Sequence, residues 1–290
     1  MVKGSRARHD INPSRYLSCS VVSTTIMRMT VEESIAELQQ QGFCILRDHF
    51  SPRLIDDCRQ AFLPILDRYL RVNADKPNRG PHRHFLAMPF DPPCFAPDFF
   101  FDREILTIVR RVMDERVVAD QWGCDVPVFG SENQNIHVDY RHPLFPEIPD
   151  ITLPTYMLVV SFGLIQITPA LGPIEIAPDT HRMPRSEALR AVECGAIPML
   201  PVTLNIGDVL IRHPWGLHRG TPNTTRTPRP FVTIRYVRRW YADSSRDVSS
   251  IPASLWQSFT PEQQAIMRFP IGERFNAGFA QVISASPAPP

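Results

Sequence analysis

The spacing of hydrophobic and polar positions changes near residue 116, and before that point it predicts helices. Thr30 with Glu33 three residues later has the pattern of a capping box, and Gly42 is a typical residue at which a helix ends. Ser51 followed by Pro52 indicates the start of a second helix. The elements predicted in this part are a helix over 30–41, a short strand over 43–50, an amphipathic helix over 51–72 and a helix over 103–114.

Beyond residue 116 the chain becomes a series of short runs rich in β-branched and aromatic residues. Examples are TYMLVVSFGLIQI (155–167) and PFVTIRYVRRW (230–240), and Pro, Gly and Asn separate the runs at close intervals. Such spacing is typical of an all-β sandwich or barrel rather than of alternating strands and helices. The predicted fold is therefore mainly β with flanking N-terminal helices, a jelly roll in which about eight strands form two facing sheets.

The prediction for domain organisation is one jelly-roll domain over residues 29–275. Residues 1–28 are basic and polar and are expected to be a disordered leader, and residues 276–290 a frayed tail. Residues 73–102 are rich in proline and aromatic side chains without a clear period, so we expect one long loop there, a length that is usually functional. Its phenylalanines are more typical of core than of a substrate wall.

Composition excludes several classes of function. The 290 residues carry a formal net charge of +1, so no overall field favours nucleic acid or an anionic membrane surface. No run of 18 apolar residues is present. The six cysteines include no C-x-x-C pair, which argues against a zinc knuckle or a disulfide framework. We expect a cytoplasmic protein with a partly apolar small-molecule substrate, and the oligomeric state is open.

The segment QNIHVDY places His137 and Asp139 two positions apart in a run predicted to be a strand end. An H-x-[D/E] pattern arises about once by chance in such a chain, so it indicates a metal site only together with suitable geometry and further ligand residues. Residues i and i+2 of a strand share one face, which lets both side chains reach one metal ion. A third ligand can come from His213 or His218, and two histidines with one carboxylate and open positions suit non-haem Fe(II).

A basic residue downstream separates the two candidate histidines. Arg229 lies eleven positions after His218, at the start of the next predicted strand, whereas the corresponding position after His213 is Thr224. Iron of this kind uses an electron-supplying co-substrate, and a planar guanidinium suits the distal carboxylate of 2-oxoglutarate. This spacing favours His218 as the third ligand.

These blocks resemble the phytanoyl-CoA dioxygenase family, in the order QNIHVDY, LGPIEIAPDTHR and GDVLIRHPWGLHRGTPNTTRTPRPFVTIRY. The early SIAELQQQGFCILRDHFSPRLIDDCRQAF is also similar, and the resemblance spans roughly residues 30–240. It implies a double-stranded β-helix that uses Fe(II), 2-oxoglutarate and O2. The residues implied for the site are the iron ligands His137, Asp139 and His218, the 2-oxoglutarate arginine Arg229, and Gln134 near the co-substrate.

Asp139 bears on the type of reaction. Related halogenases have a small residue at this position so that chloride can bind iron, so the resemblance implies hydroxylation or another oxidation of an unactivated C–H bond, with 2-oxoglutarate converted to succinate. One departure from the family pattern is Asp179, which stands where many relatives have a turn glycine. An alternative is a cupin-like metal-binding jelly roll, a binding module or isomerase without 2-oxoglutarate turnover.

A basic cluster in the predicted long loop is a candidate for contact with the substrate, because binding residues concentrate on loops over a rigid scaffold. His142 could support Asp139 but is more simply a solvated loop residue. The cluster consists of Arg79, His82, Arg83 and His84.

Overall fold

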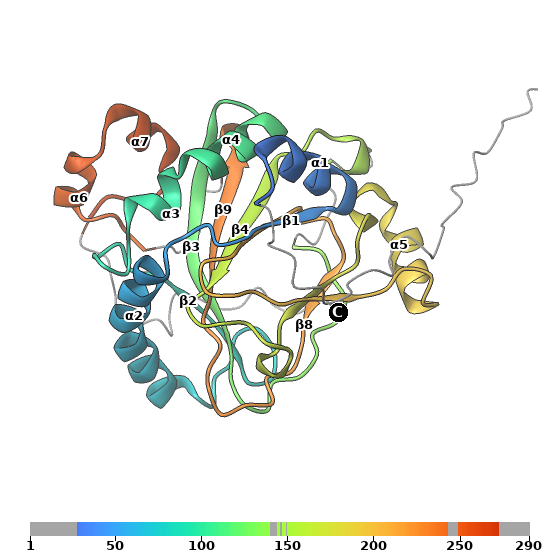
Figure 1. Ribbon diagram of the computed structural model, residues 1–290, viewed down its shortest axis with the longest axis horizontal. Helices are drawn as coiled ribbons and strands as arrows, with labels where there is room; N and C mark the ends of the chain where they lie inside the picture. Colours follow the sequence, from blue (N-terminus) through green and yellow to red (C-terminus); the bar gives the residue numbers. More distant parts are fainter. Residues whose placement is uncertain (1–27, 140–143, 146, 149, 243–248, 273–290) are drawn as a thin grey trace, which may run out of the picture.

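Two antiparallel sheets face each other in the computed structural model, which describes residues 28–139, 144–145, 147–148, 150–242 and 249–272 (Figure 1). The larger sheet has the strand order β1 (Phe43–Leu46), β7 (Val209–Arg212), β4 (Met157–Gly163), β9 (Phe231–Arg238), β3 (Val117–Pro127) and β2 (Arg83–Ala87). The smaller sheet has the order β6 (Leu200–Val202), β5 (Ile174–Ile176) and β8 (His218–Gly220).

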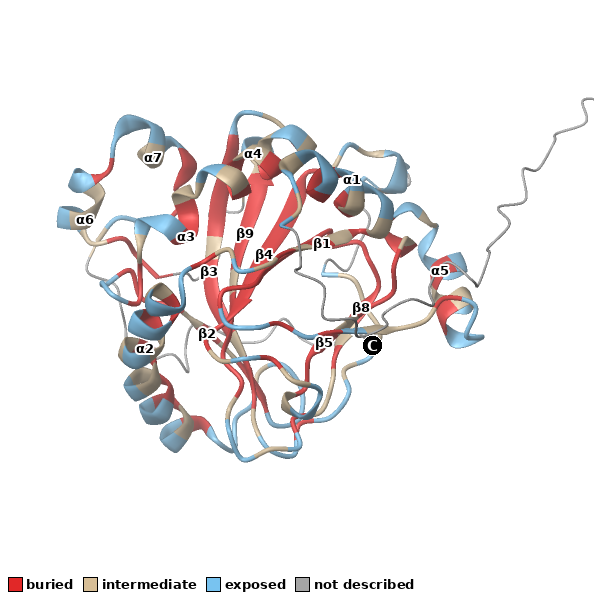
Figure 2. Cartoon of the chain, in the orientation of Figure 1, coloured by how far each residue is buried: buried red, intermediate tan, exposed pale blue. Residues whose placement is uncertain are grey.

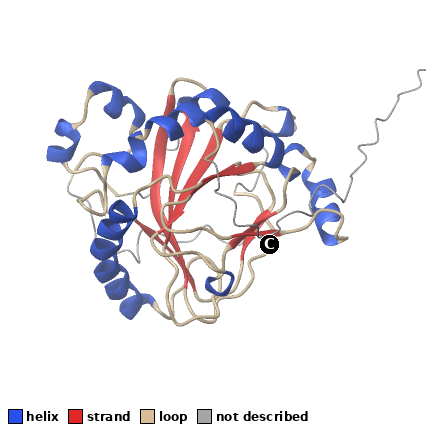
Figure 3. Cartoon of the chain, viewed as in Figure 1, coloured by secondary structure: helices blue, strands red, loops and turns tan. Residues whose placement is uncertain are grey.

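Helices lie around the outside of this β-structure (Figure 3). They are α1 (Val31–Gln41), α2 (Pro52–Asn73), α3 (Pro97–Phe101), α4 (Arg103–Val112), α5 (Arg185–Glu193), α6 (Ala253–Ser258) and α7 (Pro261–Ile266). Short 3-10 turns span Asp150–Thr152, Pro169–Leu171, Thr180–Arg182 and Arg239–Tyr241. No described helix is long and apolar enough to cross a bilayer.

The period-two alternation of the strands divides the interior into two regions. On β9, Val232, Ile234 and Tyr236 belong to the large cluster that joins the outer face of the sheet to α1–α4. Phe231 points the other way and packs with Ile174 of the smaller sheet, between the two sheets. The central strands are accordingly buried along most of their length (Figure 2). The space between the sheets is where inward-facing polar residues can meet.

The helix starts predicted from the sequence are confirmed. Thr30 and Glu33 form the capping box at α1, and the helix ends at Gly42, whose φ of 85° is a left-handed conformation that favours glycine. The side chain of Ser51 caps α2 by accepting a hydrogen bond from the backbone N–H of Leu54.

The prediction of one long loop over 73–102 is wrong, because this segment contains β2 and α3. β2 pairs along its whole length with β3, and the fully buried Phe99 stacks on Phe162 at a centroid distance of 4.8 Å. The aromatic side chains therefore fasten the segment to the core. The strand expected around residue 137 is reduced to a single bridge between His137 and His218. Of the predicted leader over residues 1–28, all but Arg28 lies outside the described residues, and so does the predicted tail over 276–290.

Candidate metal centre and co-substrate site

Three side chains meet at the edge of the smaller sheet. His137 and His218 exchange two backbone hydrogen bonds, each with an N···O distance of 3.0 Å, and the N–H of Asp139 donates to the carbonyl of Pro214 at 3.0 Å. These bonds fix the backbone so that one ligand atom from each of the three side chains lies within 4.8 Å of the others. The carboxylate of Asp139 lies 3.3 Å from Nε2 of His218. The geometry thus gathers His218, and not His213, with the H-x-D pair.

Both imidazoles are oriented by backbone carbonyls. Nδ1 of His137 lies 2.7 Å from the carbonyl oxygen of Asn135, and Nδ1 of His218 lies 2.9 Å from that of Gly216. A protonated Nδ1 would donate to each carbonyl and leave Nε2 with a lone pair for a metal. Burial, with the nearby His218, lowers the pKa of His137 to about 4, so this ring is neutral at pH 7.

Asp139 is held in its charged form. Burial alone would raise its pKa, but the Arg212 guanidinium and the His218 ring keep the pKa well below its usual range. Two neutral imidazole nitrogens and one carboxylate oxygen form the donor set that suits non-haem Fe(II) with open coordination positions. The residues present therefore fit the metal.

Arg229 lies on the same interior, just before β9, and is only 1% exposed. Its Nη2 donates to Oδ2 of Asp125 at 2.8 Å, and its Cζ lies 5.0 Å from the ring centre of Phe231. Its Nε and Nη1 are buried without a hydrogen-bond partner. Burial lowers the pKa of Arg229 to about 10, which leaves it cationic at pH 7. A buried cation with unfilled N–H groups fits an incoming carboxylate.

Arg83 completes a charged array with these residues. Its Nη1 donates to Oδ2 of Asp125 at 3.0 Å, the oxygen that Arg229 also uses, and its Nη2 donates to the carbonyl of Thr221 at 2.8 Å. Gly220 makes room for this guanidinium, because an added Cβ there would lie 2.6 Å from Cζ of Arg83. Arg83 thus orients Arg229 through Asp125.

The four basic residues proposed from sequence as one substrate patch do not form one. Strand alternation sends Arg83 inward and His84 to the opposite face, where its ring meets Tyr69 of α2 at a centroid distance of 5.5 Å. Arg79 is exposed and lies over the ring of Phe85 at 4.8 Å, and His82 is exposed as well. The alternation of β2 was hidden because the strand itself was not predicted.

Gln134 connects two pieces of backbone beside the site. Its Oε1 accepts the N–H of Gly220 at 2.9 Å, and its Nε2 donates to the carbonyl of Arg79 at 3.2 Å. This arrangement fixes the segment that carries His137 against β8. It gives Gln134 a positioning role, with any contact to a co-substrate remaining a prediction.

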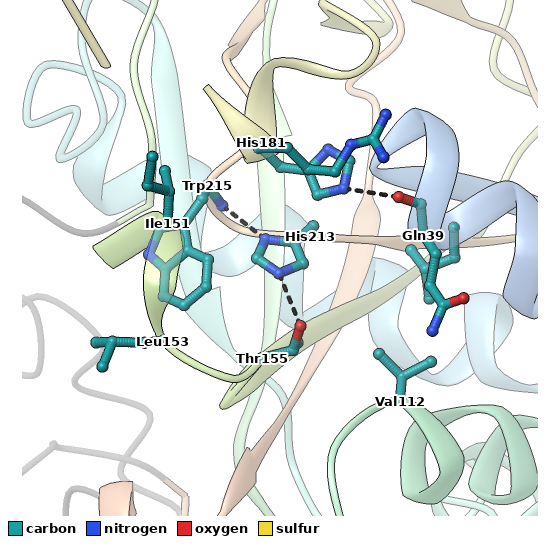
Figure 4. Close-up of a pocket in the computed structure, with 10 residues that line it drawn as sticks. Gln39, Val112, Ile151, Leu153, Thr155, His181, His213 and Trp215 are labelled. Carbon is teal, nitrogen blue, oxygen red and sulfur yellow. Dashed lines mark hydrogen bonds between the residues drawn. The ribbon is translucent and has the colours of Figure 1, made fainter. Parts of the chain in front are cut away.

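His213 lies in a separate pocket of about 330 Å³ (Figure 4). Its Nε2 is 3.2 Å from Oγ1 of Thr155, and its Nδ1 accepts the backbone N–H of Trp215 at 3.4 Å. Burial lowers its pKa well below the usual range. His213 follows Arg212 on the chain and faces the other way, which removes it from the candidate metal centre. His142, considered as a support for Asp139, lies outside the described residues.

Two further inward-facing arginines were missed by the sequence reasoning. Arg235 of β9 forms a two-bond pair with Asp120 of β3, with distances of 2.6 and 2.5 Å. Nη1 of Arg212 lies 2.7 Å from Oδ2 of Asp139. The available signal was parity, since Arg212 and Leu210 share one face of β7, as do Arg235 and Phe231 on β9.

A double-stranded β-helix with two histidines and a carboxylate between its sheets defines a class of metal-dependent enzymes. The chain belongs to the phytanoyl-CoA dioxygenase family, whose model matches residues 38–231. This family uses Fe(II), 2-oxoglutarate and O2, and the His-Asp-His triad is present here.

Solved structures with the same fold share 14–17% of their residues with this chain. The non-haem α-ketoglutarate-dependent epimerase SnoN of nogalamycin biosynthesis matches with a TM-score of 0.53 and 14% identity, over 71% of this chain and 82% of that one. The α-ketoglutarate-dependent carbocyclase SnoK of the same biosynthesis matches with a TM-score of 0.55 and 16% identity, over 72% of this chain and 86% of that one. AviO1 from Streptomyces viridochromogenes Tue57 matches with a TM-score of 0.57 and 17% identity, over 74% of this chain and 97% of that one. SnoN has also been solved with Fe3+, α-ketoglutarate and nogalamycin RO.

Proposed function

We propose that this protein is a non-haem Fe(II)- and 2-oxoglutarate-dependent dioxygenase that oxidises an unactivated C–H bond of a small molecule. One observation carries the proposal: a cluster of three metal-ligand atoms within 4.8 Å shares its interior with a buried arginine that has two unfilled nitrogens. A module that only bound a metal would have no use for such a cation. This argues against the cupin-like alternative.

Each residue has a role in this proposal. His137, Asp139 and His218 hold iron, and Arg229 binds the distal carboxylate of 2-oxoglutarate, with Asp125 fixing its guanidinium at 2.8 Å. When bound, these groups supply the oxidising chemistry, in which O2 and 2-oxoglutarate yield succinate, CO2 and an oxidant for the C–H bond. Asp139 occupies the position that a halide would need, so oxidation rather than halogenation is proposed.

The outcome at carbon is proposed as hydroxylation or a related oxidation. The neighbours named as an epimerase and a carbocyclase support this breadth, because both kinds of change can begin with the same removal of hydrogen. A small-molecule substrate is in keeping with the nogalamycin compound bound by SnoN. The five described cysteines are free thiols, in keeping with a cytoplasmic, reducing setting.

Metal titration of matched variants tests the ligand set. Wild-type protein is expected to bind one Co(II) or Fe(II) per chain, while His137→Gln and His218→Gln lose affinity by roughly 100-fold or more, because each removes one of three donors. His213→Gln is the control and should bind metal like the wild type, since its ring faces the other pocket. Equal loss in His213→Gln and His218→Gln would contradict the assignment.

A single turnover separates the two classes of function. The anaerobic complex of protein, Fe(II) and 2-oxoglutarate is exposed to O2, and succinate is measured per iron. We expect succinate from the wild type and none from His218→Gln. Metal binding without succinate, even after prolonged exposure, would favour the cupin-like module.

A further inference from the structure

Arg212 is a buried cation whose hydrogen-bonding capacity is unfilled. It ends β7 with its side chain between the sheets, opposite Phe43 of β1 and Val159 of β4, and it is 8% exposed. Its Nη1 forms an ion pair with Oδ2 of Asp139 at 2.7 Å, while its Nε is buried without a hydrogen-bond partner. Within the described part of the chain, Arg212 donates no hydrogen bond.

The charges of the interior can be counted in three groups. The pair of Arg235 and Asp120 is closed by two short bonds and is neutral. The array of Arg83, Asp125 and Arg229 carries a net charge of +1, which one carboxylate of 2-oxoglutarate balances.

The third group is the metal centre itself. Fe(II) with the Asp139 carboxylate amounts to +1, and the second carboxylate of 2-oxoglutarate balances it. Asp139 can therefore not also neutralise Arg212, which lies 2.7 Å away. With iron and co-substrate in place, the described residues of the interior keep one buried positive charge, and such a charge is costly without a partner.

Resting on the proposed function, we infer that Arg212 binds a carboxylate of the substrate beside the metal. One unbalanced positive charge calls for one negative charge, which a carboxylate supplies and a phosphate dianion exceeds. The basic residues near β2 offer no equal site, because Arg83 is committed to Asp125 and Thr221.

The rest of the substrate meets an apolar wall. Arg212 is flanked in the sheet by Phe43 of β1 and Val159 of β4, and Met157 lies on the same inward face of β4, two residues from Val159. The chemical class is therefore a monocarboxylic acid with an apolar body, held with its carboxylate at Arg212.

The test uses the anaerobic complex of the full chain with Fe(II) and saturating 2-oxoglutarate. Hexanoate and phenylacetate are titrated against hexanamide and phenylacetamide, with the shift of the visible Fe(II)–2-oxoglutarate band as the readout. We expect the acids to bind the wild type at least about tenfold more tightly than the amides, as a charge-assisted hydrogen bond provides. Arg212→Gln should remove that preference, measured at 2-oxoglutarate concentrations that saturate the visible band of the variant.

Two variants complete the design. Arg212→Lys keeps the charge and should keep a preference for acids, which a merely structural role would not require. Arg111→Gln removes an exposed cation of α4 and should behave like the wild type. Equal binding of acids and amides, no shift with either acid, or a preference that survives in Arg212→Gln would overturn the inference. Absence of the band itself in the wild type would overturn the proposed function first.

Discussion

Replacing Asp125 by asparagine should destabilise the protein strongly. One oxygen of this carboxylate accepts hydrogen bonds from Arg83 at 3.0 Å and from Arg229 at 2.8 Å, and both arginines are 1% exposed. The isosteric change leaves two buried guanidinium groups without their shared counter-charge. Removal of one partner from a buried ion pair costs about 3–5 kcal/mol in unfolding free energy. Because the Asp125 side chain is 26% exposed, we expect a loss at the lower end, about 3 kcal/mol.

The assay is urea unfolding of the metal-free protein, with Asp67→Asn as the control. Asp67 also pairs with an arginine, but both side chains are more than half exposed, so the control should lose less than about 1 kcal/mol. A double variant adds Arg83→Met, whose cost should be smaller in the Asp125→Asn background because one of two repelling cations is then gone. Equal stability of Asp125→Asn and the control would refute the reasoning.

Three further outcomes follow from the same contacts. Gly220→Ala brings a Cβ to 2.6 Å from Cζ of Arg83 and should weaken 2-oxoglutarate binding about tenfold, measured by titration; unchanged affinity would separate Arg83 from the co-substrate site. Gly42→Ala should cost about 2 kcal/mol in unfolding free energy, because its φ is 85° and the new Cβ would lie 2.6 Å from Nδ1 of His181; a neutral result would contradict this packing. Burial lowers the pKa of His181 to about 4, against about 6.5 in the unfolded chain, so the folded state binds fewer protons. The free energy of unfolding should therefore fall as the pH drops below about 7, by about 2 kcal/mol at pH 5. His181→Gln should lose less stability over the same pH range, measured by urea unfolding.

The sequence predicted the parts of the fold that local signals determine. Helix ends depend on residues close together in the sequence, and three of them are confirmed: the capping box at Thr30, the end of the helix at Gly42 and the start at Ser51. The double-stranded β-helix and the family are also as expected. β2 was missed because its stability comes from pairing with β3, about forty residues away, and not from its own composition.

The candidate site shows the same division. His137, Asp139 and His218 could be proposed because spacing and parity in short motifs place them together, as the structure does. Arg212 and Asp125 were not proposed, because a charged residue in a strand is normally expected to face solvent. Parity with Leu210 was an available signal for Arg212, but the closure of the two sheets is what shows that both positions face inward. The same closure separates Arg83 from His84, which sequence alone had grouped.

The most direct test of the central claim is a visible titration of 2-oxoglutarate into the anaerobic Fe(II) protein. The site as described predicts a weak charge-transfer band that saturates at one co-substrate per iron. Arg229→Gln should retain iron but need at least about 100-fold more 2-oxoglutarate, because it loses a buried charge-assisted contact. Arg226→Gln removes an exposed cation that lies over the ring of Phe129, and this variant should titrate like the wild type. An iron-loaded wild type without the band, or an Arg229→Gln protein with an unchanged titration, would contradict the account.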